Sequence, residues 1–121
     1  MDITKMYDGK FLKIFRKELK LPDVNRKINV EYIKHNGAIL VIPFLNDKEF
    51  IMIKQYRPVI EDFIYEFPAG NIEKDEDILE CAKREIIEEI KYEAHTWEDL
   101  GYIHLCPGYS TERIYIFKAE N

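Results

Sequence analysis

A continuous apolar run, AILVIPF at residues 38–44, is the feature that most restricts the fold. Its seven residues match the length of a β-strand, and a run without polar interruption indicates a strand that is buried on both faces. Such a strand needs a packed layer on each side. If one helix supplies one layer, the second face must be closed by a further layer of strands, by another helix or by another subunit.

Most of the remaining chain has the composition of β-strands. Segments rich in β-branched and aromatic residues predict six more strands. These cover residues 10–21, 28–35, 50–56, 64–67, 97–105 and 113–118. Turn signals separate them at Pro22-Asp23, at Asn46-Asp47-Lys48 and at Pro107-Gly108. The second turn predicts a hairpin between 38–44 and 50–56.

One long helix is expected, from about Asp77 to Tyr92. Apolar residues recur in it with the spacing of an amphipathic helix. They are Ile78, Leu79, Ala82, Ile86, Ile87 and Ile90. Asp77 and Glu80 have the spacing of a capping box. The chain is therefore expected to be an α/β (α+β) protein, with one helix packed on a mixed sheet.

Composition argues against several classes of protein. A chain of 121 residues predicts a single domain, and a net charge of −5 argues against a general nucleic-acid binder. No apolar run approaches the length of a membrane span, and the charged N-terminus does not resemble a signal peptide. Isolated Cys81 and Cys106 fit a reducing cytoplasm. The three histidines lack metal-ligand spacing, so a zinc site is not expected.

Three glutamates, Glu85, Glu88 and Glu89, crowd one part of the predicted helix. Glu85 and Glu89 share a face, and like charges at this spacing cost about 0.2–0.5 kcal/mol. A solvated surface is one explanation. The preceding Pro68-Ala69-Gly70 supports another, because a tight loop in which Gly70 permits φ > 0 can bring carbonyl oxygens near the helix. Carboxylate and carbonyl oxygens suit Mg²⁺, and a cation between the two glutamates would turn their repulsion into attraction.

Residues 70–92 resemble a Nudix box, whose pattern is G-x5-E-x7-R-E-U-x-E-E-x-G-U with U an aliphatic residue. The fixed positions that match are Gly70, Glu76, Arg84, Glu85, Glu88 and Glu89. Ile86 fills the first U and Tyr92 the last. Lys91 stands where the family has glycine, so the helix is expected to run on slightly or to exit differently.

The resemblance covers most of the chain and is to the ADP-ribose pyrophosphatase-like branch of the Nudix hydrolases. It is carried by GAILVIPF (37–44), KQYRP (54–58), YEFPAG (65–70) and PGYSTERIYIFKA (107–119). It implies a single domain over residues 1–121, folded as a mixed β-sheet sandwich with the Nudix helix on one face. It also implies a homodimer, in which N-terminal strands within residues 1–36 contribute to the partner's site.

The resemblance further implies site roles. The implied metal ligands are the Ala69 carbonyl, Glu85, Glu88 and Glu89. The catalytic candidates are Glu88, Glu89 and Glu112. The substrate-binding candidates are Arg57, Glu66 and Glu112, where the two glutamates would contact the ribose or the attacking water. Arg84, Glu76 and Gly70 would support these groups.

Structural alternatives stay open for several of these residues. Glu88 can serve only as an ion-pair partner of Arg84, Glu76 as a helix cap, and Arg57 as a plain surface residue. Three tyrosines are candidates for stacking on adenine or for ordinary core and rim positions. They are Tyr56, Tyr65 and Tyr109.

The implied reaction is Mg²⁺-dependent hydrolysis of the diphosphate bond of ADP-ribose or a related nucleoside diphosphate sugar, with AMP and ribose 5-phosphate as products. Mn²⁺ is an alternative metal. The alternative functions are hydrolysis of another nucleoside diphosphate derivative and nucleotide binding without turnover. Relatives continue past the strand at 113–118 with an acidic loop and a final helix, which are not expected within these 121 residues. Glu112 or Glu88 would then be the base, in a cytoplasmic enzyme that binds neither nucleic acid nor membrane.

Overall fold

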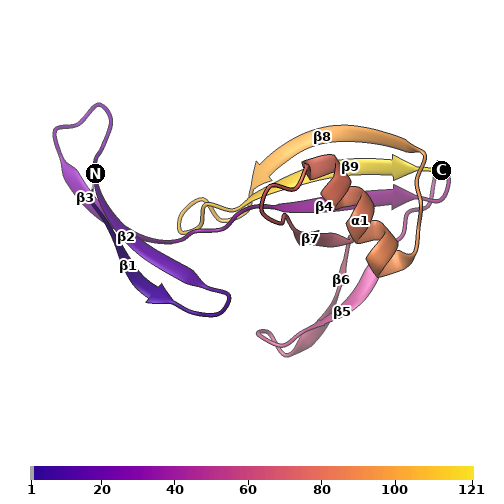
Figure 1. Ribbon diagram of the computed structural model, residues 1–121, viewed down its shortest axis with the longest axis horizontal. Coiled ribbons are helices and arrows are strands. Elements are labelled where there is room, and N and C mark those ends of the chain that lie inside the picture. The colour runs from indigo at the N-terminus through magenta and orange to yellow at the C-terminus, as the bar shows by residue number, and fades with distance from the viewer. Residues whose placement is uncertain (1) are drawn as a thin grey trace. The chain divides into compact units, whose positions relative to one another are not determined.

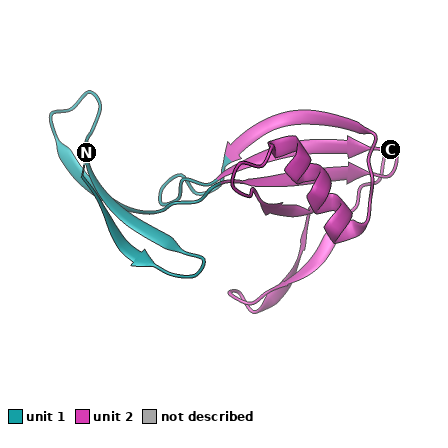
Figure 2. Ribbon diagram, in the orientation of Figure 1, with its two compact units in different colours: residues 1–36, 104–112 teal, residues 37–103, 113–121 magenta. Residues whose placement is uncertain are grey.

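The computed structural model describes residues 2–121, which form two compact units (Figure 2). Unit 1 comprises the chain up to residue 36 together with 104–112, and unit 2 comprises 37–103 together with 113–121. The expectation of a single domain over residues 1–121 stays a prediction. No helix within residues 2–121 is long and apolar enough to cross a membrane.

Unit 1 contains a three-stranded antiparallel sheet in the order β1-β2-β3. Its strands are β1 (Asp2–Asp8), β2 (Lys13–Lys20) and β3 (Lys27–Ile33). The predicted strand at 28–35 is confirmed as β3. The predicted strand at 10–21 begins later, because a turn closed by the Gly9 N–H and the Leu12 carbonyl oxygen at 2.9 Å precedes β2. β1 was not predicted, since every one of its residues is exposed and pairing with β2 alone holds it.

The segment 104–112 joins unit 1 through the end of β3. Ile33 donates its N–H to the Tyr109 carbonyl oxygen at 2.7 Å, and Thr111 donates its N–H to the Ile33 carbonyl oxygen at 3.0 Å. The predicted turn at Pro107-Gly108 is confirmed, because the N–H groups of Tyr109 and Ser110 both donate to the Cys106 carbonyl oxygen.

Unit 2 is built on a four-stranded sheet in the order β7-β4-β9-β8, with α1 packed on one face (Figure 1). Its elements are β4 (Ala38–Phe44), β7 (Ala69–Asn71), α1 (Ile78–Ile90), β8 (Thr96–His104) and β9 (Arg113–Glu120). β4 pairs in parallel with β9 and antiparallel with β7. The expected α+β class with a mixed sheet and one covering helix is therefore confirmed.

The core lies between α1 and this sheet. It consists of Ile39, Val41, Cys81, Ala82, Ile86, Phe117 and Ala119. No side chain of β4 is exposed, and its alternate residues Leu40 and Ile42 are half-buried on the other face. The predicted apolar stripe is wrong at Ile87, which is 50% exposed. Ile87 lies one residue beyond Ile86, and the 100° helical step turns it away from the sheet.

The predicted hairpin between 38–44 and 50–56 is wrong. β5 (Ile53–Arg57) instead pairs with β6 (Asp62–Glu66) in a separate two-stranded sheet. β4 keeps a bridge between Phe44 and Phe50, next to which the Ile51 N–H donates to the Pro43 carbonyl oxygen at 2.9 Å. The turn itself forms, because Asn46 Oδ1 accepts the Lys48 N–H at 2.8 Å. The pairing does not continue along β4 because β9 lies along one of its edges and β7 pairs with Ala38–Leu40 on the other.

Candidate active site

Helix α1 carries the glutamate-rich segment and has a cap at each end. Asp77 is the N-cap, and its Oδ2 accepts the Glu80 N–H at 3.1 Å, as the capping spacing predicted. At the other end Lys91 has a left-handed backbone (φ 53°, ψ 40°) and donates its N–H to the Ile87 carbonyl oxygen at 3.0 Å. The expectation that Lys91 extends or redirects the helix is therefore wrong: Lys91 adopts the conformation in which glycine usually ends a helix.

Gly70 lies in β7 directly against the carboxylate of Glu85. A Cβ at position 70 would overlap the carboxyl carbon and both oxygens of Glu85. The sequence-based reason for this glycine is wrong, because positive φ among the glycines of residues 2–121 occurs only at Gly37 and Gly101. Residues 69–71 also form a strand and not a loop. Gly70 is required for space.

Glu85, which is partly buried, and Glu89, which is exposed, are carboxylates that repel each other. The side chain of Glu85 is 13% exposed. Burial raises the pKa of Glu85. Burial also raises the pKa of Glu89, and the charge of Glu85 raises it further. A backbone hydrogen bond from Ala69 acts in the opposite direction and lowers this pKa. The two groups therefore form a concentration of negative charge for which a cation would be favourable.

Arg84 is surrounded by carboxylates. Its Nε and Nη2 donate to Glu76 at 2.8 and 3.0 Å, and its Nη1 donates to Glu85 at 3.0 Å and to Glu88 at 3.2 Å. Glu73 lies 3.8 Å from Nη2. All three guanidinium nitrogens are engaged, so Arg84 orients carboxylates and has little capacity left to bind a phosphate.

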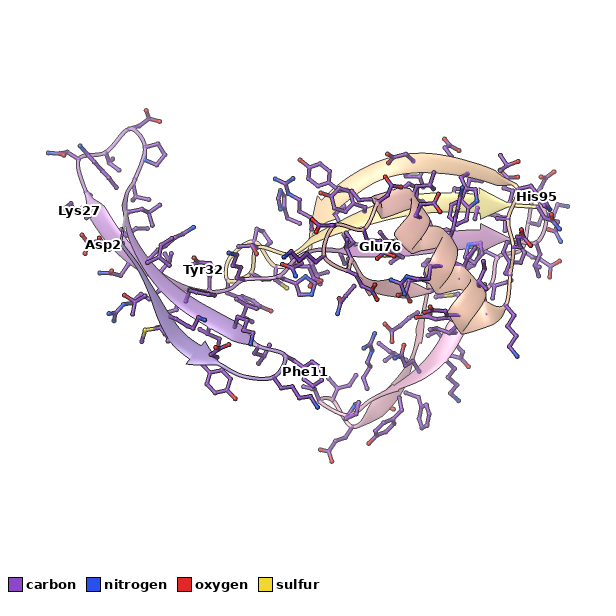
Figure 3. The ribbon with its side chains drawn as sticks, in the orientation of Figure 1. Asp2, Phe11, Lys27, Tyr32, Glu76 and His95 are labelled. Atoms are coloured by element: carbon purple, nitrogen blue, oxygen red, sulfur yellow. The ribbon has the colours of Figure 1, made fainter. Side chains whose placement is uncertain are left out.

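Glu76 precedes α1 (Figure 3) and is held firmly in place. The hydrogen bonds from Arg84 lower its pKa to about 2, and the N–H of Glu73 donates to its Oε1 at 3.1 Å. Glu88 is 57% exposed and pairs with Arg84 at the predicted i,i+4 spacing. The roles of Glu76 as a cap or an outer ligand, and of Glu88 as a ligand or a base, stay predictions.

The carboxylates fit a hard, hydrated cation. Within residues 2–121 no group of three or more His, Cys, Asp or Glu side chains is arranged to hold a metal ion. Mg²⁺ does not need such a group, because one or two carboxylates commonly hold it while water and substrate phosphates complete its coordination. Glu85 and Glu89 each supply a carboxylate oxygen as a ligand. Burial and mutual repulsion both disfavour the negative charges of these two groups. This donor set suits Mg²⁺ or Mn²⁺.

A second ion pair lies on the β5–β6 hairpin. Arg57 donates from Nε and Nη2 to the two carboxylate oxygens of Glu66, at 2.8 and 2.6 Å. These bonds raise the pKa of Arg57 and lower that of Glu66. The charge of Glu89 also raises the pKa of Arg57, so the pair lies within electrostatic reach of Glu89 on α1.

β5 and Glu89 line an open cavity of about 530 Å³. The other lining residues are Ile53, Lys54 and Gln55. Sequence reasoning assigned no role to Lys54 or Gln55, although both belong to KQYRP, the segment that supplied Arg57. The sequence contained one indication of their position at the cavity, which is that both residues lie close to Arg57 in the same segment.

The other candidates are Glu112 and three tyrosines. Glu112 and Tyr109 belong to unit 1, where the Glu112 N–H donates to Ser110 Oγ at 3.1 Å. In unit 2, Tyr56 packs edge-on against Phe63 with ring centroids 5.0 Å apart, and Tyr65 is exposed. Their proposed contacts with substrate stay predictions.

The chain is similar in sequence to two proteins from Bacillus species. The chain is 34% identical over 116 residues to the methanol dehydrogenase activator of Bacillus methanolicus and 32% identical over 116 residues to the ADP-ribose pyrophosphatase of Bacillus subtilis. Each match covers 96% of this chain and 62% of the relative, so the chain spans about three fifths of their length.

A solved structure described as an ADP compounds hydrolase matches the fold with a TM-score of 0.86 at 20% identity, covering 100% of this chain and 65% of that one. The family model described as NUDIX domain matches residues 34–121, which include β4, α1 and every residue of the glutamate-rich site. This chain therefore belongs to the NUDIX domain family.

Proposed function

We propose that the chain hydrolyses the diphosphate bond of ADP-ribose or a related nucleoside diphosphate sugar, in a reaction that requires Mg²⁺ and releases AMP and ribose 5-phosphate from ADP-ribose. Membership of the NUDIX family supports the class of site. The similarity to an ADP-ribose pyrophosphatase supports the choice of substrate.

One observation carries the proposal: Glu85 is partly buried with its carboxylate against the bare backbone of Gly70, and Glu89 lies one helical turn further along the same face. A protein that used Glu85 only for solubility would leave it in water, where its charge costs little. Burying Glu85 and crowding it with the charge of Glu89 is favourable when a cation binds between them. Glu85 and Glu89 would hold this cation, with the Ala69 carbonyl as a further ligand.

The chemistry is addition of water to one phosphorus, with breakage of its bond to the bridging oxygen, which leaves on the other phosphate. Bound Mg²⁺ supplies positive charge that neutralises phosphate oxygens and makes a water more acidic. Arg57 binds a phosphate oxygen. A carboxylate takes the proton from the attacking water, with Glu88, Glu89 and Glu112 as the candidates.

The direct test is to incubate the purified chain with ADP-ribose, with and without Mg²⁺, and to follow AMP by chromatography. Glu89→Gln should abolish AMP release because it removes one of the two crowded charges. Glu80→Gln is the matched control, since it makes the same substitution on the same helix at an exposed position whose carboxylate pairs with Lys83. AMP release that survives Glu89→Gln would contradict the assignment.

The alternatives are distinguished in the same experiment. Turnover of GDP-mannose but not of ADP-ribose would keep the reaction and change the substrate. No turnover of either, with thermal stabilisation by ADP-ribose, would indicate a domain that binds nucleotide without hydrolysis.

We further propose a homodimer in which the unit 1 sheet contacts the partner. Unit 1 carries nine Lys and Arg and six Asp and Glu, whereas unit 2 carries nine and 17, so their formal charges are +3 and −8. Apolar side chains of unit 1 are exposed, and Phe11 at the β1–β2 turn is 86% exposed (Figure 3). Opposite charge and exposed apolar area both favour association between copies.

Light scattering at micromolar concentration tests this assembly, and a monomer would contradict it. We also propose a cytoplasmic location, supported by the free thiols of Cys81 and Cys106.

A further inference from the structure

The Arg57–Glu66 pair joins opposite ends of the β5–β6 hairpin. In the hairpin register Arg57 lies opposite Asp62 near the tip, whereas Glu66 lies opposite Ile53 at the base. Four residues of strand separate the two positions, which is about 13 Å along the ribbon. The Arg57 side chain therefore extends back along the hairpin to reach Glu66.

Arg57 makes this ion pair although a nearer carboxylate is available. Asp62 is its direct cross-strand neighbour, and opposite charges at such positions normally attract each other. The Asp62 Oδ1 instead accepts the N–H of Phe63 at 2.8 Å. The guanidinium is consequently held at the hairpin base, where it is within electrostatic reach of Glu89, and not at the tip.

The two partners differ in burial and in remaining hydrogen-bonding capacity. The side chain of Glu66 is 20% exposed and that of Arg57 is 47% exposed. Glu66 engages Nε and Nη2 of Arg57, and within residues 2–121 the Nη1 group makes no hydrogen bond or ion pair. Arg84 offers the contrast, since carboxylates occupy all three of its nitrogens. Arg57 alone of these two arginines retains donors for a ligand.

We propose that Glu66 is a positioning residue: it holds the Arg57 guanidinium at the base of the β5–β6 hairpin and leaves Nη1 to bind a phosphate oxygen of a nucleoside diphosphate sugar. This inference rests on the proposed function and replaces the contact between Glu66 and ribose or water that the resemblance implied. Its physical basis is preorganisation. A two-pronged ion pair fixes both the place and the plane of the guanidinium, so less conformational freedom is lost when phosphate binds.

The test is a double-mutant cycle with Glu66→Ala, Arg57→Ala and the double variant. Two quantities are measured for each: the kinetic constants for ADP-ribose with Mg²⁺, and the ADP-ribose Kd in EDTA by calorimetry. Arg57→Ala should raise KM and Kd about 10- to 100-fold, as expected for loss of a charged hydrogen bond. Glu66→Ala should raise them about tenfold with a smaller change in kcat, and the double variant should be no worse than Arg57→Ala.

Asp62→Asn is the matched control, because Asp62 lies opposite Arg57 in the register but makes no ion pair with it. It should leave KM and Kd unchanged. Thermal melting of every variant shows whether folding is intact. A Glu66→Ala effect of the same size with and without Arg57 would overturn the inference, since a direct contact with substrate acts independently of Arg57.

The failure of the inference and the failure of the proposed function give different results. If wild-type chain releases AMP but the two substitutions are additive, only the positioning role is wrong. If wild-type chain binds ADP-ribose without turnover and the cycle still shows coupling, the positioning role stands and the hydrolytic function is wrong. Absence of both turnover and binding overturns both.

Discussion

Replacing Gly70 by alanine places a methyl group where the Glu85 carboxylate lies, because a Cβ at this position overlaps the carboxyl carbon and both oxygens. The carboxylate must retreat to ordinary contact distance, which requires a movement of roughly 1–2 Å. The overlapping atoms are the far end of a flexible side chain, so β7 and α1 can stay in place while Glu85 adopts another rotamer.

The effects on stability and on activity should therefore separate. Gly70 does not have a positive φ, so alanine is compatible with its backbone and should stabilise by about 0.4–1 kcal/mol through the unfolded state. A strained Glu85 rotamer costs about 0.5–1.5 kcal/mol, which leaves a net change within about 1 kcal/mol. Displacing a group that holds the reacting centre by about 1 Å costs on the order of 10²-fold in rate, or about 2.7 kcal/mol of activation free energy.

The assay pairs urea unfolding with kcat/KM for ADP-ribose and with Mn²⁺ binding by calorimetry. Gly108→Ala is the control, because no atom lies within 4 Å of a Cβ at that position and it should change none of the three quantities. Activity of Gly70→Ala within about threefold of wild type would refute the argument that Glu85 must lie against the backbone of β7. Destabilisation by several kcal/mol would refute it differently, by showing that the backbone and not the carboxylate gives way.

Four further results are expected. Lys91→Gly should raise the free energy of unfolding by about 0.5–1 kcal/mol, because glycine has no Cβ to strain at φ 53°. No increase in urea unfolding, or an equal increase for Lys91→Ala, would contradict this. Ile86→Ala should lower the free energy of unfolding by about 2–5 kcal/mol, since Ile86 is 1% exposed. A loss below 1 kcal/mol would mean that the core repacks to fill the cavity left by the smaller side chain. EDTA should abolish AMP release and excess Mg²⁺ should restore it, whereas turnover that persists in EDTA would exclude a metal requirement. The Glu76 pKa is lowered from 4.5 to about 2, so the contribution of Glu76 to the free energy of unfolding is present above pH 4.5 and is lost as the pH falls toward 2. Glu76→Gln should therefore make the free energy of unfolding less dependent on pH between 4.5 and 2. An unchanged pH dependence would contradict the pairing with Arg84.

Local periodicity and spacing predicted the elements whose signals lie within a few residues of one another. The run at 38–44 became β4 with the expected bounds, because seven consecutive apolar residues are incompatible with an exposed segment. The helix was placed to within two residues at its C-terminal end, since its stripe and its Asp77 cap are both local. β1 escaped prediction because a strand exposed along its whole length has no burial pattern to detect.

Strand partners were less predictable, because pairing is a competition between distant segments. The turn at Asn46 was predicted correctly, yet 50–56 follows β4 only as far as its end, since β7 pairs with Ala38–Leu40 on one edge and β9 occupies the other. Nothing local to 107–111 indicated that this turn would bind the end of β3, about 76 residues earlier. Such choices depend on every other strand that seeks the same edge.

The sequence by itself determined that Glu85 and Glu89 share one helical face and that Arg84 reaches Glu88, because these relations follow from the 3.6-residue repeat of a helix. Tertiary structure alone decided that Gly70 is needed for space and not for its φ, and that Arg57 reaches past Asp62 to Glu66. The reason is that a helix repeat fixes neighbours within one element, whereas the approach of β7 to α1 and the burial of Glu66 depend on how separate elements pack.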